Sequence, residues 1–159
     1  MRYYMKSKLF KFKEDFWIKN EYEKDAYFID KKFISLGLQF DILKDNHLVY
    51  RVKEKLLTFM SNYEIFENDN VIARVNQKIT FLKDNIKIES KYGEFIIIGD
   101  IFGIDYKILK GNKVVATASK ELFAFTDNYS VDINFEDEAF MLCLVVIIDN
   151  IKDNRKNNQ

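Results

Sequence analysis

The chain has 159 residues, of which 48% are hydrophobic and 16% aromatic, so it can form one domain with a sizeable core and is not a disordered segment. Its 25 basic residues balance 25 acidic ones, which excludes the uniform positive field of many nucleic-acid-binding proteins. A single cysteine, Cys143, excludes an internal disulfide and a cysteine-based zinc site, and we expect a reducing, cytoplasmic location.

The chain begins with a segment in which basic and apolar residues are mixed. Four lysines are interleaved with leucine and phenylalanine, and no acidic residue interrupts them. Charges at these positions exclude the apolar core of a secretory signal peptide. The segment, residues 6–13, is called the basic strip, and it predicts contacts with anionic lipid headgroups. An edge strand whose lysines discourage aggregation is the simpler interpretation, and the acids that follow at once favour it. The lysines of the basic strip are Lys6, Lys8, Lys11 and Lys13.

A repeated unit then organises most of the chain. Each unit opens with a lysine, or once with a glycine, and continues with an apolar run, a polar pause and an alternating segment. The units begin at residues 8, 32, 55, 78, 99 and 120, so successive starts are 24, 23, 23, 21 and 21 residues apart. This length suits two antiparallel strands with short turns and is too short for a parallel pair with a crossover helix. The six units therefore predict about twelve strands.

Local patterns inside the units agree with strands. Residues 48–53 and 71–75 have the period-two character of strands. Residues that tolerate positive φ lie between the expected strands at 44–46, 68–70 and 111–112, where tight hairpin turns are expected. A sheet of this size usually closes, because open edges are exposed hydrogen-bonding templates. A closed barrel of about twelve strands is too wide for its own side chains to fill.

Residues 139–148 supply a filling for that barrel, because they are ten consecutive apolar residues. A helix that is hydrophobic all round must be buried on every side. A membrane-spanning helix needs about 20 such residues, and Glu138 and Asp149 end this run too early. A central strand remains an alternative because residues 145–148 are β-branched. The preceding acids favour a helix capped by Asp137, and residues 152–159 are expected to be a polar, disordered tail.

Residues that could carry catalysis are scarce. His47 is the only histidine and adjoins a predicted turn, where a solvent-exposed imidazole is the simplest interpretation. The glycines at 93, 99, 103 and 111 lack phosphate-loop or dinucleotide-binding spacing and are typical of bulges and turns. We therefore predict no enzymatic activity, no catalytic residues, no cofactor and no metal.

Three segments, at 62–81, 113–133 and 139–151, resemble the LURP-one-related family of the tubby C-terminal-like superfamily. The resemblance covers residues 1–151 and is nearest to small bacterial members. It implies a single barrel domain over 1–151, made of twelve antiparallel strands around a hydrophobic C-terminal helix. Tubby-type domains bind phosphoinositides, but their basic pairs cannot be matched to positions here.

The resemblance extends distantly to phospholipid scramblases, which carry an acidic calcium-binding stretch before their apolar segment. Residues 126–140 are loosely similar and contain five acids that could supply oxygen ligands. The stretch lacks the alternation and turn glycine of an EF-hand loop, and helix capping explains the last three acids without a metal. The five acids are Asp127, Asp132, Glu136, Asp137 and Glu138.

These observations predict an all-β fold with one helix: a closed antiparallel barrel around a buried C-terminal helix. We expect a monomeric, non-enzymatic binding or scaffold module in the cytoplasm, in peripheral contact with a membrane through anionic lipid headgroups or another amphiphile. A protein-interaction module with an unknown partner is the first alternative. A calcium-dependent, scramblase-type lipid-interacting protein is the second. Neither nucleic-acid binding nor a transmembrane segment is expected.

Overall fold

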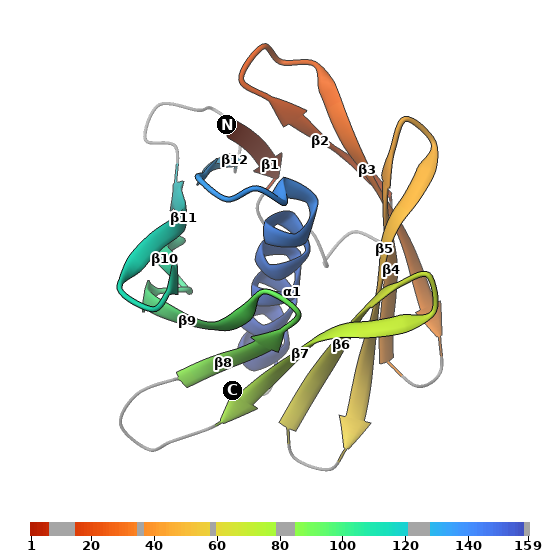
Figure 1. The fold of residues 1–159 in the computed structure, drawn as a ribbon, viewed down its shortest axis with the longest axis vertical. Helices are drawn as coiled ribbons and strands as arrows, with labels where there is room; N and C mark the ends of the chain where they lie inside the picture. Colours follow the sequence, from red (N-terminus) through yellow and green to blue (C-terminus); the bar gives the residue numbers. More distant parts are fainter. Residues whose placement is uncertain (7–14, 35–36, 58–59, 79–84, 121–127, 158–159) are drawn as a thin grey trace.

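The computed structural model describes residues 1–6, 15–34, 37–57, 60–78, 85–120 and 128–157. These residues form twelve strands that surround one helix (Figure 1). The helix, α1, spans Glu138–Asn157. The strands are β1 (Arg2–Lys6), β2 (Phe16–Asn20), β3 (Asp25–Ile34), β4 (Gly37–Lys44), β5 (His47–Leu57), β6 (Met60–Glu67), β7 (Asn70–Lys78), β8 (Asn85–Ser90), β9 (Gly93–Asp100), β10 (Asp105–Lys110), β11 (Lys113–Lys120) and β12 (Asn128–Ile133).

The strands form one closed antiparallel barrel. Each strand pairs with its neighbours in the chain, and β1 closes the barrel by pairing with β12, from Arg2 opposite Asp132 to Lys6 opposite Asn128. The predicted fold class is confirmed. Among the described residues β1 also pairs with β2 through Tyr3 and Tyr4, but this pairing does not reach Lys6, and the edge-strand interpretation of the basic strip stays a prediction. Its other lysines lie in 7–14, outside the described residues.

The six sequence units all lie at one end of the barrel. The unit that begins at Lys55, for example, starts in β5 and continues into β6, and every unit covers the connection from an odd-numbered strand to the next even-numbered strand. This end is called the repeat rim, and the opposite end is called the turn rim. At the turn rim, Asp45, Asn46, Asn68 and Asp69 have φ between 46° and 66°, which confirms two of the predicted tight turns.

The fifth unit begins with a glycine for a steric reason. Gly99 has a φ of 112°, and a Cβ at this position would lie 2.5 Å from the backbone oxygen of Asp105 on the paired strand. Only glycine fits so close an approach between β9 and β10. The repeat therefore loses its lysine where the two backbones come nearest.

A β-bulge recurs near the turn rim in four of the hairpins. The register shifts between Ile18 and Lys19, between Ile42 and Leu43, between Ile65 and Phe66, and between Ile108 and Leu109. An inserted residue reverses the direction in which the following side chains point. The period-two pattern that predicted strands at 48–53 and 71–75 therefore changes face near its start. As a result three aliphatic side chains face solvent on the outer side of the barrel, namely Leu48, Val71 and Val114.

The helix fills the barrel as predicted. Residues 140–148 are buried, and Leu144 is 1% exposed. The helix begins at Glu138, and the Asp137 carboxylate accepts a hydrogen bond from the Phe140 N–H at 2.9 Å, which confirms Asp137 as the cap. The strand alternative for 145–148 is thereby excluded.

The predicted disordered tail from residue 152 requires a correction, since α1 continues to Asn157. Lys152 and Asp153 are 3% and 5% exposed, so this polar part of the helix also lies inside the barrel. Lys152 is held by an ion pair with Asp149 one turn earlier. Polar composition suggested solvation, but polar residues can be buried where they have partners.

Candidate functional site

The turn rim holds the N-terminal end of α1 through buried tyrosines. The hydroxyls of Tyr50 on β5 and Tyr92, in the β8–β9 turn, both donate to Oδ2 of Asp137 at 2.5 Å. Burial and these hydrogen bonds raise the pKa of both tyrosines. The Asp137 carboxylate is therefore engaged three times, once by the helix backbone and twice by the barrel wall.

The next acid, Glu138, is tied in the same way. Its Oε2 accepts a hydrogen bond at 2.6 Å from Tyr3 on β1, whose ring packs edge-on against Tyr27 on β3. Burial, followed by the hydrogen bond to Glu138, raises the pKa of the Tyr3 hydroxyl. Two of the five acids proposed as calcium ligands thus serve to attach the helix to different strands of the barrel.

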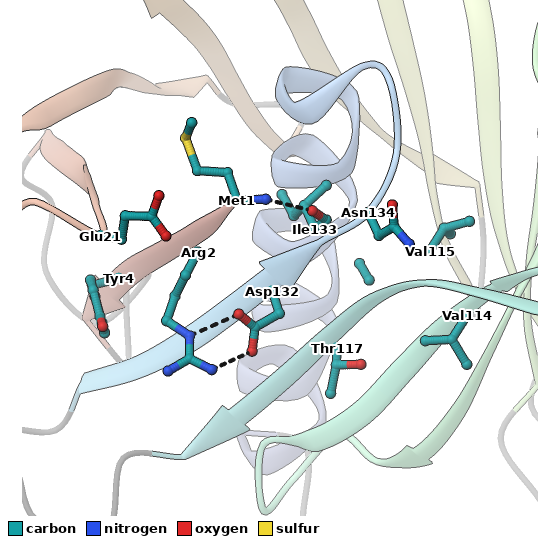
Figure 2. Close-up of a pocket in the computed structure, with 11 residues that line it drawn as sticks. Met1, Arg2, Tyr4, Glu21, Val114, Val115, Thr117, Asp132, Ile133 and Asn134 are labelled. Carbon is teal, nitrogen blue, oxygen red and sulfur yellow. Dashed lines mark hydrogen bonds and ion pairs between the residues drawn. The ribbon is translucent and has the colours of Figure 1, made fainter.

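A groove of about 550 Å³ crosses the outer surface of β11, β12 and β1 near this end (Figure 2). It is called the outer groove. Val114, Val115 and Ile133 contribute its apolar part, and Tyr4 and Glu21 lie at its other side. A neighbouring hollow of about 650 Å³ is lined in part by Lys110, Lys113, Glu136 and Glu138. Both are concave surfaces of a size that can hold a small ligand, so they are the first places to look for one.

The charged groups of the outer groove neutralise each other. The Arg2 guanidinium donates from Nε and Nη2 to the two carboxylate oxygens of Asp132, each at 2.8 Å (Figure 2). Hydrogen bonding to Asp132 raises the pKa of Arg2, and the guanidinium in turn lowers the pKa of Asp132. Such a bidentate pair leaves neither partner free to transfer a proton or to hold a metal. The groove is therefore a shape that could bind a ligand and carries no acid–base pair.

The described residues contain no arrangement suited to catalysis. His47 is exposed at the first position of β5, as expected, and Cys143 is buried in the helix, where burial raises the pKa of its thiol. Of the proposed calcium ligands, Asp127 lies outside the described residues and Glu136 is exposed. Within the described part of the chain no three histidine, cysteine or acidic side chains converge on a metal position.

Lysines near the repeat rim differ in whether an acidic side chain pairs with them. Lys32 forms an ion pair with Asp41 on β4 at 3.7 Å, and Lys55 forms one with Glu64 on β6 at 3.3 Å. Lys6 is exposed at the last position of β1, and no acid among the described residues pairs with it. Lys6 is thus the one member of the basic strip that the structure places, and it lies at the repeat rim.

Sequence reasoning missed the polar layer inside the barrel near the repeat rim. Asp149, Asn150, Lys152 and Asp153 of α1 are all no more than 5% exposed, and Glu54 of β5 is 8% exposed. Their only sequence signal was that charged residues continue a helical register directly after the apolar run. The described residues contain no helix that is both long and apolar enough to cross a bilayer.

The fold defines a class of protein: a twelve-strand antiparallel barrel with a helix in its lumen. A model of the LURP-one-related family matches residues 1–149, and the chain belongs to that family. An uncharacterized protein of Bacillus subtilis (strain 168), YxjI, is 28% identical over 147 residues, which cover 91% of this chain and 89% of YxjI.

The barrel is also similar to a solved structure. An X-ray structure of a protein from Arabidopsis thaliana, AT5G01750, superposes with a TM-score of 0.68 and 18% identity, over 94% of this chain and 90% of that one. At this level of identity the likeness concerns the fold. The match to the family model confirms the resemblance to the family that residues 62–81, 113–133 and 139–151 predicted.

Proposed function

We propose that this chain is a non-enzymatic binding module whose ligand is an anionic lipid headgroup at a membrane surface. One observation carries the proposal: Lys6 ends β1 exposed and without an acidic partner among the described residues, and the sequence continues with three more lysines and no acid up to residue 13. By contrast, Lys32 and Lys55 at the same rim are offset by acids.

The composition of the basic strip suits a bilayer surface. Lys6, Lys8, Lys11 and Lys13 supply positive charge, and Leu9, Phe10 and Phe12 between them supply apolar side chains for the interfacial region. Each basic residue near an anionic surface contributes about 1 kcal/mol at low screening. The helix that fills the lumen leaves little room there for an enzyme pocket, which favours binding over chemistry.

Flotation with liposomes tests this proposal. The protein is expected to float with vesicles containing phosphatidylserine or phosphoinositide, to stay behind with pure phosphatidylcholine, and to detach as salt is raised. A Lys8→Glu and Lys11→Glu double variant should bind at least about 30-fold more weakly, since the loss of two lysines removes about 2 kcal/mol and the added carboxylates repel the anionic surface. Lys107→Glu, at an exposed position on β10, is the control and should bind nearly as wild type. Equal flotation of both variants would refute the role of the strip.

A second candidate function, protein binding, is supported by a different surface. Ile96 and Ile98 on the outside of β9 are 45% and 47% exposed, and Ile96 lies opposite Leu109, which in turn lies opposite Val114. This aliphatic row spans three adjacent strands, and apolar rows of this kind mark interaction sites. A lysate protein retained by the wild type and by Lys6→Glu, but lost with Ile98→Asp, would favour this function over lipid binding.

A further inference from the structure

On one side of the polar layer inside the barrel, the polar side chains form hydrogen bonds with one another and with the backbone. Asn150 donates from Nδ2 to the Tyr63 hydroxyl at 2.7 Å, and Tyr63 donates to Oε1 of Glu54 at 3.2 Å. The other carboxylate oxygen of Glu54 accepts the Leu38 N–H at 2.9 Å. Asn154, one turn after Asn150, also donates to Glu54 at 3.4 Å. This half faces β4, β5 and β6.

The other half of the same layer is not satisfied. Asp149 and Asp153 are one helical turn apart, so they share a face of α1, and Asp149 is paired with Lys152. Oδ2 of Asp153 and the hydroxyl of Tyr129 on β12 are both buried, and neither has a hydrogen-bond partner. Asp153 is 5% exposed and Tyr129 is 1% exposed. Buried polar atoms of this kind usually have partners.

The two unpartnered oxygens belong to side chains near the same rim of the barrel, since Tyr129 is the second residue of β12 at the repeat rim and Asp153 lies in the part of α1 near that rim. The charges of Asp149 and Asp153 both add to the burial that raises the pKa of Tyr129, which agrees with this placement. Tyr106 on β10 is also buried, and burial together with the charge of Asp149 raises the pKa of its hydroxyl. Ala118 on β11, buried between these two strands, adds only a methyl group. A small bound species at this place could contact Tyr129 and Asp153 together.

The charges of the layer indicate which kind of species it is. Asp149 is paired with Lys152, whereas Oδ2 of the buried Asp153 carboxylate has no hydrogen-bond partner. A bridging water would satisfy the hydrogen bonds of Asp153 and Tyr129 but not the charge of that carboxylate, and an uncompensated buried carboxylate is costly.

We infer that the lumen binds one monovalent alkali cation between Oδ2 of Asp153 and the hydroxyl oxygen of Tyr129. A carboxylate and a phenol oxygen are hard ligands of the type that such cations take, and a single positive charge compensates the carboxylate of Asp153. The site lies inside the barrel, away from the basic strip and the outer groove. It goes beyond the proposed headgroup binding and does not depend on it.

Thermal unfolding at constant ionic strength tests the inference. N-methyl-D-glucamine chloride, whose cation is too large for the lumen, is replaced stepwise by sodium chloride or potassium chloride. The wild type is expected to show a saturable rise in Tm with at least one of the two salts, because a ligand that binds only the folded state stabilises it. Asp153→Asn should abolish the rise. Asp105→Asn, at an exposed position on β10, is the matched control and should retain it.

Each other outcome overturns the inference. A wild-type Tm that does not change with the cation would mean that Asp153 is satisfied without a metal. A rise that persists in Asp153→Asn would place the cation elsewhere. If Asp153→Asn does not fold, Tyr129→Phe provides the test. The apparent dissociation constant of the cation should increase about tenfold in this variant, as expected for the loss of an oxygen contact to a charged group. An unchanged constant would refute the site.

Discussion

The two ends of α1 are held in different ways. At the turn rim, Asp137 and Glu138 each accept hydrogen bonds from tyrosines of the barrel wall, and the helix cap uses the remaining oxygen of Asp137. At the repeat rim, the polar residues of the helix are divided between a satisfied side and a side with two unpartnered oxygens. At the first end the chain itself supplies hydrogen-bond partners for both acids, whereas at the second end two buried oxygens have no partner in the chain.

We interpret the fully hydrogen-bonded end of α1 as structural and the incompletely hydrogen-bonded end as a candidate binding site. Complete pairing fixes a buried polar group in one arrangement, and incomplete pairing marks positions where the fold tolerates a cost. Between the two ends the apolar segment 139–148 supplies the burial that holds the barrel together. The predictions below remove first the apolar middle, then the satisfied end, and then test how that end responds to pH.

The largest effect is expected for Leu144→Asp in the apolar middle of the helix. Leu144 is 1% exposed, so the variant loses about 2–5 kcal/mol of packing and buries a carboxylate at a further cost of several kcal/mol. Domains of this kind are stable by only about 5–15 kcal/mol. Circular dichroism should show no cooperative melt of any soluble material. A soluble Leu144→Asp variant that melts cooperatively would contradict the central position of the helix.

Asp137→Ala is expected to destabilise the barrel by about 3–5 kcal/mol, because it removes the helix cap and leaves two buried hydroxyls without acceptors. Urea unfolding followed by fluorescence measures the change in free energy. Asp137→Asn is the control, since its amide oxygen can still cap the helix and it should lose less. Equal losses for the alanine and asparagine variants would mean that the helix cap contributes nothing beyond the tyrosine contacts.

Stability is expected to fall at alkaline pH. Tyr3, Tyr50 and Tyr92 have pKa values raised above their ordinary value of 10.0, so in the folded state they keep their protons where the unfolded chain releases them. Their contribution is fully present below pH 10 and is lost as the pH rises further. The free energy of unfolding, measured by urea titration across this range, should decrease above pH 10. Tyr92→Phe should flatten the decrease, and a profile without any decrease would contradict the burial of these hydroxyls.

Much of the fold could be predicted because the length of the repeated unit limits the secondary structure that each unit can form. A unit of 21 to 24 residues that begins with Lys32, Lys55 or Lys78 has room for two antiparallel strands and little else. The apolar run 139–148 has no polar face, so it had to be enclosed, and Asp137 stands where a cap is needed. These local rules agree with one another, which is why the barrel, its helix and the tight turns at Asp45 and Asn68 followed from them.

The rest depended on contacts between distant residues. Nothing in the spacing of Tyr50, Tyr92 and Asp137 shows that they meet, because they lie on separate elements that only barrel closure brings together. The tail was expected to be disordered since Lys152 and Asp153 are charged, yet the ion pair to Asp149 allows this turn to be buried. The bulge that turns Leu48 outward depends on the pairing of β4 with β5 and is likewise invisible in period-two alternation.

The most direct test of the contrast within the polar layer compares two buried tyrosines. Tyr63 and Tyr129 are 0% and 1% exposed, but only the Tyr63 hydroxyl has hydrogen-bond partners. Free energies of unfolding of Tyr63→Phe and Tyr129→Phe would be measured with urea, with N-methyl-D-glucamine as the only added cation. Tyr63→Phe should lose about 1–3 kcal/mol, whereas Tyr129→Phe should match or exceed the wild type. Equal losses in both variants, or a larger loss in Tyr129→Phe, would contradict the division of the layer.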